Sequence, residues 1–542
     1  MTTELQPDRQ NGRAGTGPWD QSSAGPDDGP ASRRGSAGAS AVHARRRRGL
    51  LARHPEWPIV ALLAGYPLWW AMGVADYMFV ALAVPMAVRL YVWHTRGRRP
   101  LRLPPGFSLW LLFLVCMLAG ILMLRLTAPG TVVSPVSNRI VSFTARAISY
   151  GAVTIVLLYA GNLTERELPR RRLAWLLGLL AIYVVVGGVG GVLDPHFQFT
   201  APLALVVPHS VEHAMLNQGM LHPALAQLQA VLGVPQGRPS APFDYTNTWG
   251  NSLAILLPWL VVAWWATGTR RSRWITFAAL VISIVPIIYS LDRDLWIALL
   301  FAACYLAYRL AARGRLAVLG LTCGGILLVG IVIVTTPLQS LISQRLNHGQ
   351  SDQIRTDLSG IAIRDALASP VIGFGDTRHI QGSASSIAVG PTANCPQCGQ
   401  ETVGANGQLQ LLLVCNGLAG TLFYLAFFIY GAWRYRRDGT PYGMAGVLVL
   451  LLSFVFMIAY DAVGEPLCFT MLAYALLWRN DVQMLSPDPE SSDLPGESGT
   501  AGARRRAVTS RPPGLIPRRP QPGVRQMPEL ASGPASRDEQ QT

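Results

Sequence analysis

The stretch Leu173–Leu193, LAWLLGLLAIYVVVGGVGGVL, decides the fold class of this chain. It contains no charged residue, and about twenty apolar residues in an α-helix cross the roughly 30 Å hydrocarbon core of a bilayer. Comparable near-continuous apolar runs occur at Phe107–Leu124, Leu316–Val334 and Val447–Ala459. This repetition predicts an all-α polytopic membrane protein.

Outward from that stretch, residues 56–479 form the predicted membrane domain, with about twelve transmembrane helices. The expected spans are 57–73, 77–93, 107–125, 140–160, 173–193, 247–266, 274–290, 295–312, 316–335, 404–430, 442–460 and 466–479. The flanking segments 1–55 and 480–542 are rich in Gly, Ser, Pro and Arg and poor in apolar residues. Such composition predicts disordered tails.

The placement of arginine predicts the orientation of the chain. The basic connectors, which alternate with basic-poor ones, are 96–102, 166–172, 270–273, 313–315 and 434–437. Under the positive-inside rule this alternation places both termini in the cytoplasm of a multi-pass cell-membrane protein. Two long loops, about 194–246 and 336–402, are then extracytoplasmic.

Each long loop contains a predicted helix. In the first loop, a helix is expected near His209–Leu232, with Leu225 and Leu228 among its apolar positions. In the second, Ile354–Leu367 has amphipathic spacing and is stopped by Ser369-Pro370. Such a helix is expected to lie along the membrane interface.

The formal net charge of +15 raises the question of a nucleic-acid partner. All 45 basic residues are arginine, and most lie in the short connectors and the tails. Because no basic-aromatic array accompanies them, membrane lipids are the expected surroundings and nucleic acid is excluded as a partner.

The second long loop concentrates positive charge on the side where membrane proteins normally avoid it. Its arginines are Arg345, Arg355, Arg364 and Arg378, and Arg125, Arg139, Arg146, Arg238 and Arg293 also lie at or near the outer ends of spans. Guanidinium groups bind phosphate in fork geometry and keep their charge, so the set is suited to a lipid-linked diphosphate. Alternatively, these arginines anchor helix ends and pair with nearby aspartates.

Three further patterns are weaker. His209-Ser-Val-Glu-His213 resembles a metalloprotease motif, but no third ligand is spaced to match, so no metal site is predicted. Cys395-Pro-Gln-Cys398 could be a loop disulfide or two free thiols. Asp461 and Glu465 fall in a short outer turn and are expected to be solvated.

Four short stretches occur in a fixed order along the chain. They are Arg238-Pro-Ser-Ala-Pro-Phe243 with Tyr245-Thr-Asn247, Ser290-Leu-Asp-Arg293-Asp-Leu-Trp296, Arg345 and Arg355 with Ser369-Pro370 and Gly373-Phe-Gly375, and Gly404-Ala-Asn406-Gly-Gln-Leu409. Together they resemble the O-antigen ligase and polysaccharide polymerase superfamily of integral membrane glycosyltransferases. The resemblance covers roughly residues 200–428 and implies a GT-C-like helical fold.

The resemblance implies a metal-independent and cofactor-free transfer of glycan from a polyprenyl-diphosphate-linked donor to a glycan or lipid acceptor. The roles it implies are diphosphate binding by Arg238, Arg293, Arg345 and Arg355, and other substrate contacts by Asn247 and Asn406. One departure is that many ligases have a catalytic His before the asparagine, where this chain has Ala405.

Another residue would then have to accept the proton of the acceptor hydroxyl group. The candidates near Ala405 in sequence are Glu401, Asp376, His379 and His348, and Glu401 is favoured because it is nearest. The alternative to an enzyme is a transporter or flippase of an anionic lipid-linked substrate, which should show internal repeats and mid-membrane charges. No convincing repeat is found, and the expected function is therefore polymerisation or transfer of surface polysaccharide.

Overall fold

The computed structural model describes residues 54–97, 99–207, 218–229, 235–317, 319–320, 322–325, 327, 350–381 and 400–485. Within these ranges the chain is mostly helical, with two short β-hairpins. Most of the expected span 316–335 lies outside the described residues. Arg345, His348, the His209–His213 motif and the cysteine pair at 395 and 398 also lie outside them.

Seven of the described helices are long and apolar enough to cross a membrane, as an all-α polytopic membrane protein requires. They are α5 (Ala75–Thr95), α7 (Val136–Asn162), α8 (Arg170–Leu193), α11 (Thr246–Leu260) with its π-helical continuation η3 (Val261–Ala266), α12 (Arg270–Tyr289), α13 (Arg293–Ala311) and α17 (Gln408–Tyr435). Other helices in the same region are α3 (Trp57–Ala64), α4 (Tyr66–Met72), α6 (Phe107–Ala119) with η1 (Gly120–Met123), α18 (Pro441–Met457) and α19 (Glu465–Leu485). The total of twelve spans, the GT-C-like arrangement and the side on which the termini lie stay predictions.

The first expected span, 57–73, is not one helix. It is divided at Gly65 into α3 and α4. Pro67 in the first turn of α4 has no backbone N–H to continue the preceding helix. The carbonyl of Ala61 accepts from the Gly65 amide at 3.1 Å and also from Trp69 Nε1 at 2.8 Å, which ties α4 to the end of α3. The single helix expected over 57–73 is therefore two shorter helices, and the crossing of the membrane by this segment stays a prediction.

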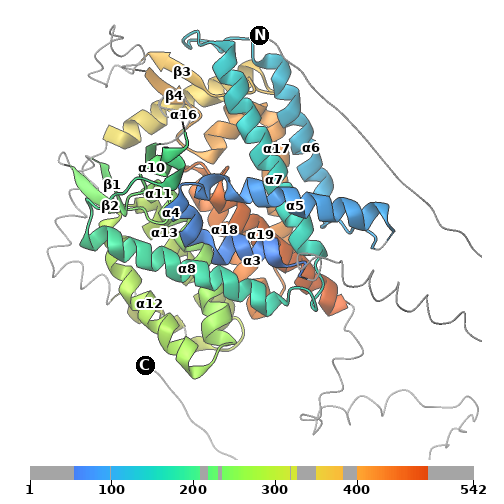
Figure 1. The fold of residues 1–542 in the computed structure, drawn as a ribbon, viewed down its shortest axis with the longest axis vertical. Coiled ribbons are helices and arrows are strands. Elements are labelled where there is room, and N and C mark those ends of the chain that lie inside the picture. Colours follow the sequence, from blue (N-terminus) through green and yellow to red (C-terminus); the bar gives the residue numbers. More distant parts are fainter. Residues whose placement is uncertain are drawn as a thin grey trace, which may run out of the picture. The chain divides into compact units, whose positions relative to one another are not determined.

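The interior of the helical bundle is formed largely by α11 and α19. In the apolar window of α11 with η3, 78% of the residues are buried, compared with 22% in α12 and 17% in α13. Residues 467–478 of α19 are all buried, and α19 packs against α7, α18 and α11 (Figure 1). The apolar side chains of α12 and α13 thus face outward, as is typical of helices in contact with lipid.

The first long loop folds differently from the prediction. Where a helix was expected near His209–Leu232, the described residues form a four-residue helix, α10 (Gln218–Leu221), and then strand β1 (Ala226–Gln229). Pro223 lacks the N–H donor that a continuing helix would need. Strand β1 pairs antiparallel with β2 (Gln236–Pro239), and a short 3₁₀ helix, η2 (Pro202–Leu205), precedes α10. The predicted helix is therefore wrong for residues 222–229.

The helix predicted at Ile354–Leu367 is confirmed as α16 (Gln350–Ala368), which ends immediately before Ser369-Pro370. Its buried face includes Leu358 and Ala362 and packs on α17 and on a second hairpin (Figure 1). In that hairpin, β3 (Arg378–Gln381) pairs antiparallel with β4 (Gln400–Val403). Because this face is buried, the rotation of α16 about its axis is fixed. The direction of its remaining side chains is therefore fixed as well.

The glycine-rich turn that follows α16 packs against a kink in α17. Gly417 interrupts the helical backbone of α17 with a φ of 65°. The amides of Phe374 and Gly375 donate to the carbonyls of Val414 and Cys415, at 2.8 and 2.9 Å, on the side of the kink. Gly373-Phe-Gly375 thus makes a close backbone approach that ties the second long loop to α17.

Replacing Gly375 by alanine is expected to destabilise the protein by about 2 kcal/mol or more. Gly375 has a φ of 73°, and an added Cβ atom would lie 2.3 Å from the backbone oxygen of Gly120. Thermal unfolding in detergent measures the effect. Gly360→Ala is the matched control, because its Cβ atom in α16 would meet nothing within 4 Å. Equal unfolding midpoints for the two variants would contradict the expectation.

Candidate functional site

A cavity of about 430 Å³ lies where the two long loops meet the ends of several helices. Three residues selected from the sequence line it: Asn247 in the first turn of α11, Arg355 on α16, and Asn406 just before α17. We call it the Arg355 cavity. Tyr460 and Asp461, in the turn between α18 and α19, also line it. Tertiary structure thus brings together residues that are far apart in the chain.

Arg355 is the arginine of α16 that lines this cavity. The side chain is 30% exposed, and its Nη1 lies 3.6 Å from Asp294 Oδ2 at the start of α13. The guanidinium carbon also lies 5.7 Å from the centre of the Tyr460 ring. At this exposure and distance the ion pair contributes little to stability, about 1 kcal/mol or less. Arg355 therefore lines the cavity with its guanidinium group held by Asp294 and Tyr460.

Arg238 lies behind the cavity wall. Its side chain is buried, and Nε donates to the carbonyl oxygen of Ser290 at 2.6 Å. The two terminal nitrogens donate to Gln229 Oε1 at 2.5 Å and Asn247 Oδ1 at 3.5 Å. Both acceptors line the cavity. Burial lowers the pKa of Arg238, and the nearby carboxylate of Asp292 opposes that shift.

The Asp292 side chain joins three elements next to Arg238. Its Oδ1 accepts from the amides of Asp294 and Leu295, both at 3.1 Å, and so caps α13. The same oxygen accepts a hydrogen bond of 2.7 Å from the Tyr460 hydroxyl group. Gly250 permits this approach, since an added Cβ atom there would lie 2.5 Å from Asp292 Oδ2. Burial raises the pKa of Asp292 to about 6, against the effect of the Tyr460 hydrogen bond.

Arg293, the first residue of α13, is half-buried and is not among the residues that line the cavity. Arg364 is exposed on α16, where its Nη2 lies 3.4 Å from the carbonyl oxygen of Pro129. Neither position brings a guanidinium group into the Arg355 cavity. Among the described arginines, Arg355 is the one that lines this cavity.

Three other arginines hold backbone segments in place. Arg378 is fully buried and donates to the carbonyls of Asp376, Thr377, Leu126 and Phe374 at 2.8–3.1 Å. Burial and the charge of Arg139 lower the pKa of Arg378 to about 10.

Arg139 donates to the carbonyls of Leu124 and Leu126. Arg146 forms a buried ion pair with Asp376. For these three arginines the structure thus shows the anchoring role that the sequence left open as an alternative.

The sequence candidates for proton acceptor lie elsewhere in the structure. Asp376 pairs with Arg146, and His379 Nδ1 lies 3.1 Å from Thr402 Oγ1 across the β3–β4 hairpin. Glu401 stands opposite Ile380 in the same hairpin, and its Oε2 is buried with no hydrogen-bond partner among the described residues. None of these three candidates lines the Arg355 cavity. Proximity to Ala405 in sequence does not bring them to its wall.

Three carboxyl groups that were not selected as proton acceptors from the sequence do line the cavity: Asp76 in the first turn of α5, Asp461 in the turn between α18 and α19, and Glu465 at the start of α19. Glu465 was expected to be solvated, but it is only 8% exposed, and its Oε1 accepts from Tyr66 Oη at 3.4 Å. That expectation was wrong because the helix ends around Glu465 cover it. One sequence signal could have indicated these residues. Asp76 and Glu465 each lie at the end of an expected span, on the same expected side of the membrane.

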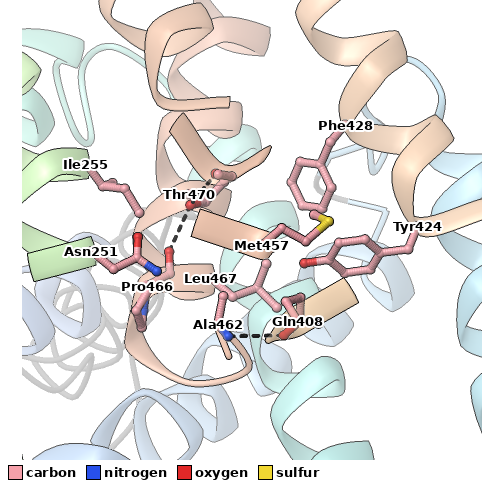
Figure 2. A pocket seen from close by; sticks show the side chains of 11 residues that line it. Asn251, Ile255, Gln408, Tyr424, Phe428, Met457, Ala462, Pro466, Leu467 and Thr470 are labelled. Atoms are coloured by element: carbon pink, nitrogen blue, oxygen red, sulfur yellow. Dashed lines mark hydrogen bonds between the residues drawn. The ribbon is translucent and has the colours of Figure 1, made fainter. Parts of the chain in front are cut away.

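The turn that carries Tyr460 and Glu465 is held from behind by Gln408. The backbone amide of Gln408 donates to the Tyr460 carbonyl at 2.9 Å, and its Oε1 accepts from the Ala462 amide at 3.1 Å. Figure 2 shows this contact beside a small cavity of about 10 Å³, roughly the volume of one water molecule. Asn251 Oδ1, which has no hydrogen-bond partner among the described residues, lines that cavity. Gln408 therefore fixes the turn that contributes Tyr460 to the Arg355 cavity.

Neither protein-family models nor curated proteins nor solved structures gave a match to this chain. The resemblance to O-antigen ligases and polymerases therefore stays an interpretation of the four sequence motifs. Any functional conclusion depends on the residues of the Arg355 cavity.

Proposed function

We propose that this chain is an integral membrane glycosyltransferase that takes a glycan from a polyprenyl-diphosphate-linked donor and transfers it to a hydroxyl acceptor in cell-surface polysaccharide synthesis. One observation carries the proposal: Asn247, Arg355 and Asn406 line a single cavity. They come from three of the four motifs on which the family resemblance depends. A chance set of motifs has no reason to converge in space.

The chemistry of the cavity suits a diphosphate leaving group. When the bond between the anomeric carbon and the diphosphate oxygen breaks, the electron pair leaves with the diphosphate. The guanidinium group of Arg355 can hydrogen-bond to two phosphate oxygens and stabilise that charge. Arg238 adds positive charge from behind the wall and orients the Asn247 amide through their hydrogen bond.

The size of the cavity also suits a sugar joined to a diphosphate. Ligand pockets in proteins commonly span about 300–1,000 Å³, and the Arg355 cavity has about 430 Å³. Asn247 and Asn406 provide amide donors and acceptors for sugar hydroxyl groups or phosphate oxygens. A long polyprenyl chain does not fit in this volume, so the lipid would extend from the cavity into the bilayer.

The proposal is tested with purified protein reconstituted in lipid nanodiscs and given a short polyprenyl-diphosphate-linked oligosaccharide. We expect release of polyprenyl diphosphate that depends on a glycan acceptor and is competed by added polyprenyl diphosphate. In proteoliposomes, movement of the intact donor across the bilayer without cleavage would contradict the proposal and support the flippase alternative. Failure to bind the donor at all would contradict both functions.

A further inference from the structure

One aromatic ring in the wall of the Arg355 cavity is open to a ligand. Tyr245, at the start of α11, lines the cavity and is 46% exposed. Tyr460, the other aromatic residue among the described ones that line it, is 6% exposed, and its hydroxyl group is bonded to Asp292. Tyrosine is also common where a membrane meets water, but such a ring contacts lipid and does not line a polar cavity. Tyr245 is therefore placed to contact a ligand.

The backbone on both sides of this ring is held in place. The buried residue Thr246 donates from its amide to Gln227 Oε1 at 3.2 Å and from its hydroxyl group to the Arg238 carbonyl at 3.3 Å. The Tyr245 carbonyl accepts from the Trp249 amide at 3.0 Å, within the first turn of α11. Because this backbone is already fixed, a ligand that contacts the ring orders only the side chain.

Three amide side chains line the same cavity, and their oxygen atoms are engaged by the protein. Gln227 Oε1 accepts from the Thr246 amide, and Gln229 Oε1 and Asn247 Oδ1 accept from the Arg238 guanidinium group. Since an N–H group needs an acceptor, these bonds fix which end of each amide faces its protein partner. The three NH₂ groups form no hydrogen bond to a described residue and remain as donors.

Gln227 and Gln229 act together because of their place in the strand. They lie two residues apart on β1, so their side chains leave the same face of the strand. Both line the cavity. Their NH₂ groups thus provide two neighbouring donors next to the start of α11.

The cavity wall also has carboxyl groups, those of Asp76, Asp461 and Glu465. A diphosphate accepts hydrogen bonds and is matched by Arg355 and by amide donors, but not by carboxyl groups. A sugar hydroxyl group both donates and accepts, so it can bond to an amide and to a carboxyl group. Part of this wall therefore suits a sugar better than it suits a diphosphate.

The open ring of Tyr245 adds a contact that a sugar can use and a diphosphate cannot. A pyranose ring has C–H bonds on its faces, and these carry a small positive charge. The face of an aromatic ring is negative, so it attracts them, and the contact also removes apolar surface from water. An aromatic ring beside amide and carboxyl groups thus matches a pyranose in both its apolar and its polar parts.

We propose that Tyr245, Gln227 and Gln229 form a sugar subsite of the Arg355 cavity, which binds the pyranose ring joined directly to the donor diphosphate. This inference rests on the proposed glycosyltransferase function for the identity of its ligand. Tyr245 stacks on a C–H face of the ring, and the glutamine NH₂ groups donate to hydroxyl oxygens at its edge. Because the cavity of about 430 Å³ holds about one sugar and its diphosphate, this sugar is the one next to the diphosphate at Arg355.

The test compares binding of two ligands to protein in lipid nanodiscs. One is a short polyprenyl diphosphate, and the other is the same lipid diphosphate with one glucose, galactose, mannose or N-acetylglucosamine residue. The wild type should bind at least one of the sugar-bearing lipids more tightly than the sugar-free one. We expect Tyr245→Ala to weaken binding of that sugar-bearing lipid by about tenfold and to leave the sugar-free lipid within about twofold. Tyr245→Phe keeps the ring and should stay within about threefold of the wild type.

The matched control is Tyr289→Ala. Tyr289, at the end of α12, is also 46% exposed but does not line the cavity. The Tyr245 side chain forms no cap hydrogen bond to α11, and binding of the sugar-free lipid shows that each variant is folded. The proposal would be overturned by unchanged binding of the sugar-bearing lipid to Tyr245→Ala, by an equal loss for both lipids, or by the same loss in Tyr245→Phe. A wild type that gains no affinity from any of the sugars would overturn it too.

Gln229→Met tests the amide donors, because methionine has a similar length and no NH₂ group. It should weaken binding of the sugar-bearing lipid by about fivefold. Binding of the sugar-free lipid should not weaken, since Arg238 then has a donor released from Gln229. Equal losses for the two lipids, or no loss for either, would exclude the glutamine from the subsite.

The sugar subsite and the glycosyltransferase function fail in different ways. If the wild type binds the sugar-bearing lipid through Tyr245 but transfers no glycan, the glycosyltransferase function fails and the subsite stands. If glycan transfer proceeds and Tyr245→Ala loses no affinity that depends on the sugar, the subsite fails and the function stands.

Discussion

Replacing Arg355 by glutamine is expected to lower glycan transfer by about 100-fold to 1,000-fold. The substitution keeps a polar side chain of similar reach, but it removes the positive charge and the paired N–H donors that a diphosphate needs. Donor binding should weaken as well, because the diphosphate is charged before the transition state. Arg355→Lys should recover only part of the activity, since a lysine ammonium group cannot form the two parallel hydrogen bonds.

The matched control for this substitution is Arg364→Gln. Both arginines lie on α16, but Arg364 is exposed and its Nη2 contacts the Pro129 carbonyl at 3.4 Å instead of lining the cavity. Transfer rates and donor affinity are measured on both variants in nanodiscs. Full activity of Arg355→Gln, or the same loss in Arg364→Gln, would contradict a diphosphate site at Arg355.

Replacing Arg378 by methionine is expected to destabilise the protein by about 3–5 kcal/mol. The guanidinium group donates to four backbone carbonyls, including those of Leu126 and Phe374. Methionine fills a similar volume but has no donor, so the buried carbonyls of Asp376 and Phe374 lose these hydrogen bonds, and each loss costs about 1–3 kcal/mol. Arg378→Lys should recover a fraction, because an ammonium group cannot reach all four acceptors.

The effect is measured by thermal unfolding of purified protein in detergent and by the yield of folded protein. Arg364→Met is the control for loss of an arginine in the same loop, and it should change the unfolding midpoint little. Arg355→Gln should also leave the midpoint close to that of the wild type. An Arg378→Met variant that is as stable as the wild type, or a destabilised Arg355→Gln variant, would contradict the division into anchoring and cavity-lining arginines.

Much of the helical fold was predictable from local sequence. The apolar run Leu173–Leu193 is part of α8, and the amphipathic spacing at Ile354–Leu367 is α16, stopped by Ser369-Pro370. Such segments are determined by hydrophobic length and periodicity, which act within one element. The last expected span, 466–479, lies within the longer helix α19 for the same reason.

The wrong predictions share a cause. At 57–73 the apolar composition suggested one helix, but Gly65 and Pro67 divide it. Apolar composition alone does not show where a helix is interrupted. At residues 222–229, Leu225 and Leu228 matched a helical spacing, yet β1 is stabilised by pairing with β2. Strand pairing depends on a partner segment, which a window along the chain does not contain.

The candidate site was predictable in its residue types and less so in their roles. The sequence selected Asn247, Arg355 and Asn406, and they line one cavity. The sequence could not separate Arg355 from Arg378, because both are arginines in one loop and their burial is set by packing. For the same reason it assigned Glu465 to solvent and favoured Glu401 as the base by its distance along the chain.

The sequence by itself determined a helical membrane protein and the position of α16, and it selected the motif residues that we propose bind a diphosphate. Each of these follows from the chemistry or periodicity of a short segment. Tertiary structure alone decided which arginine lines a cavity, which arginines bind backbone carbonyls, and that Asp76 and Glu465 line the same cavity. The physical reason is that burial, charge and hydrogen bonding of a side chain depend on neighbours from distant segments, and only the folded chain brings those together.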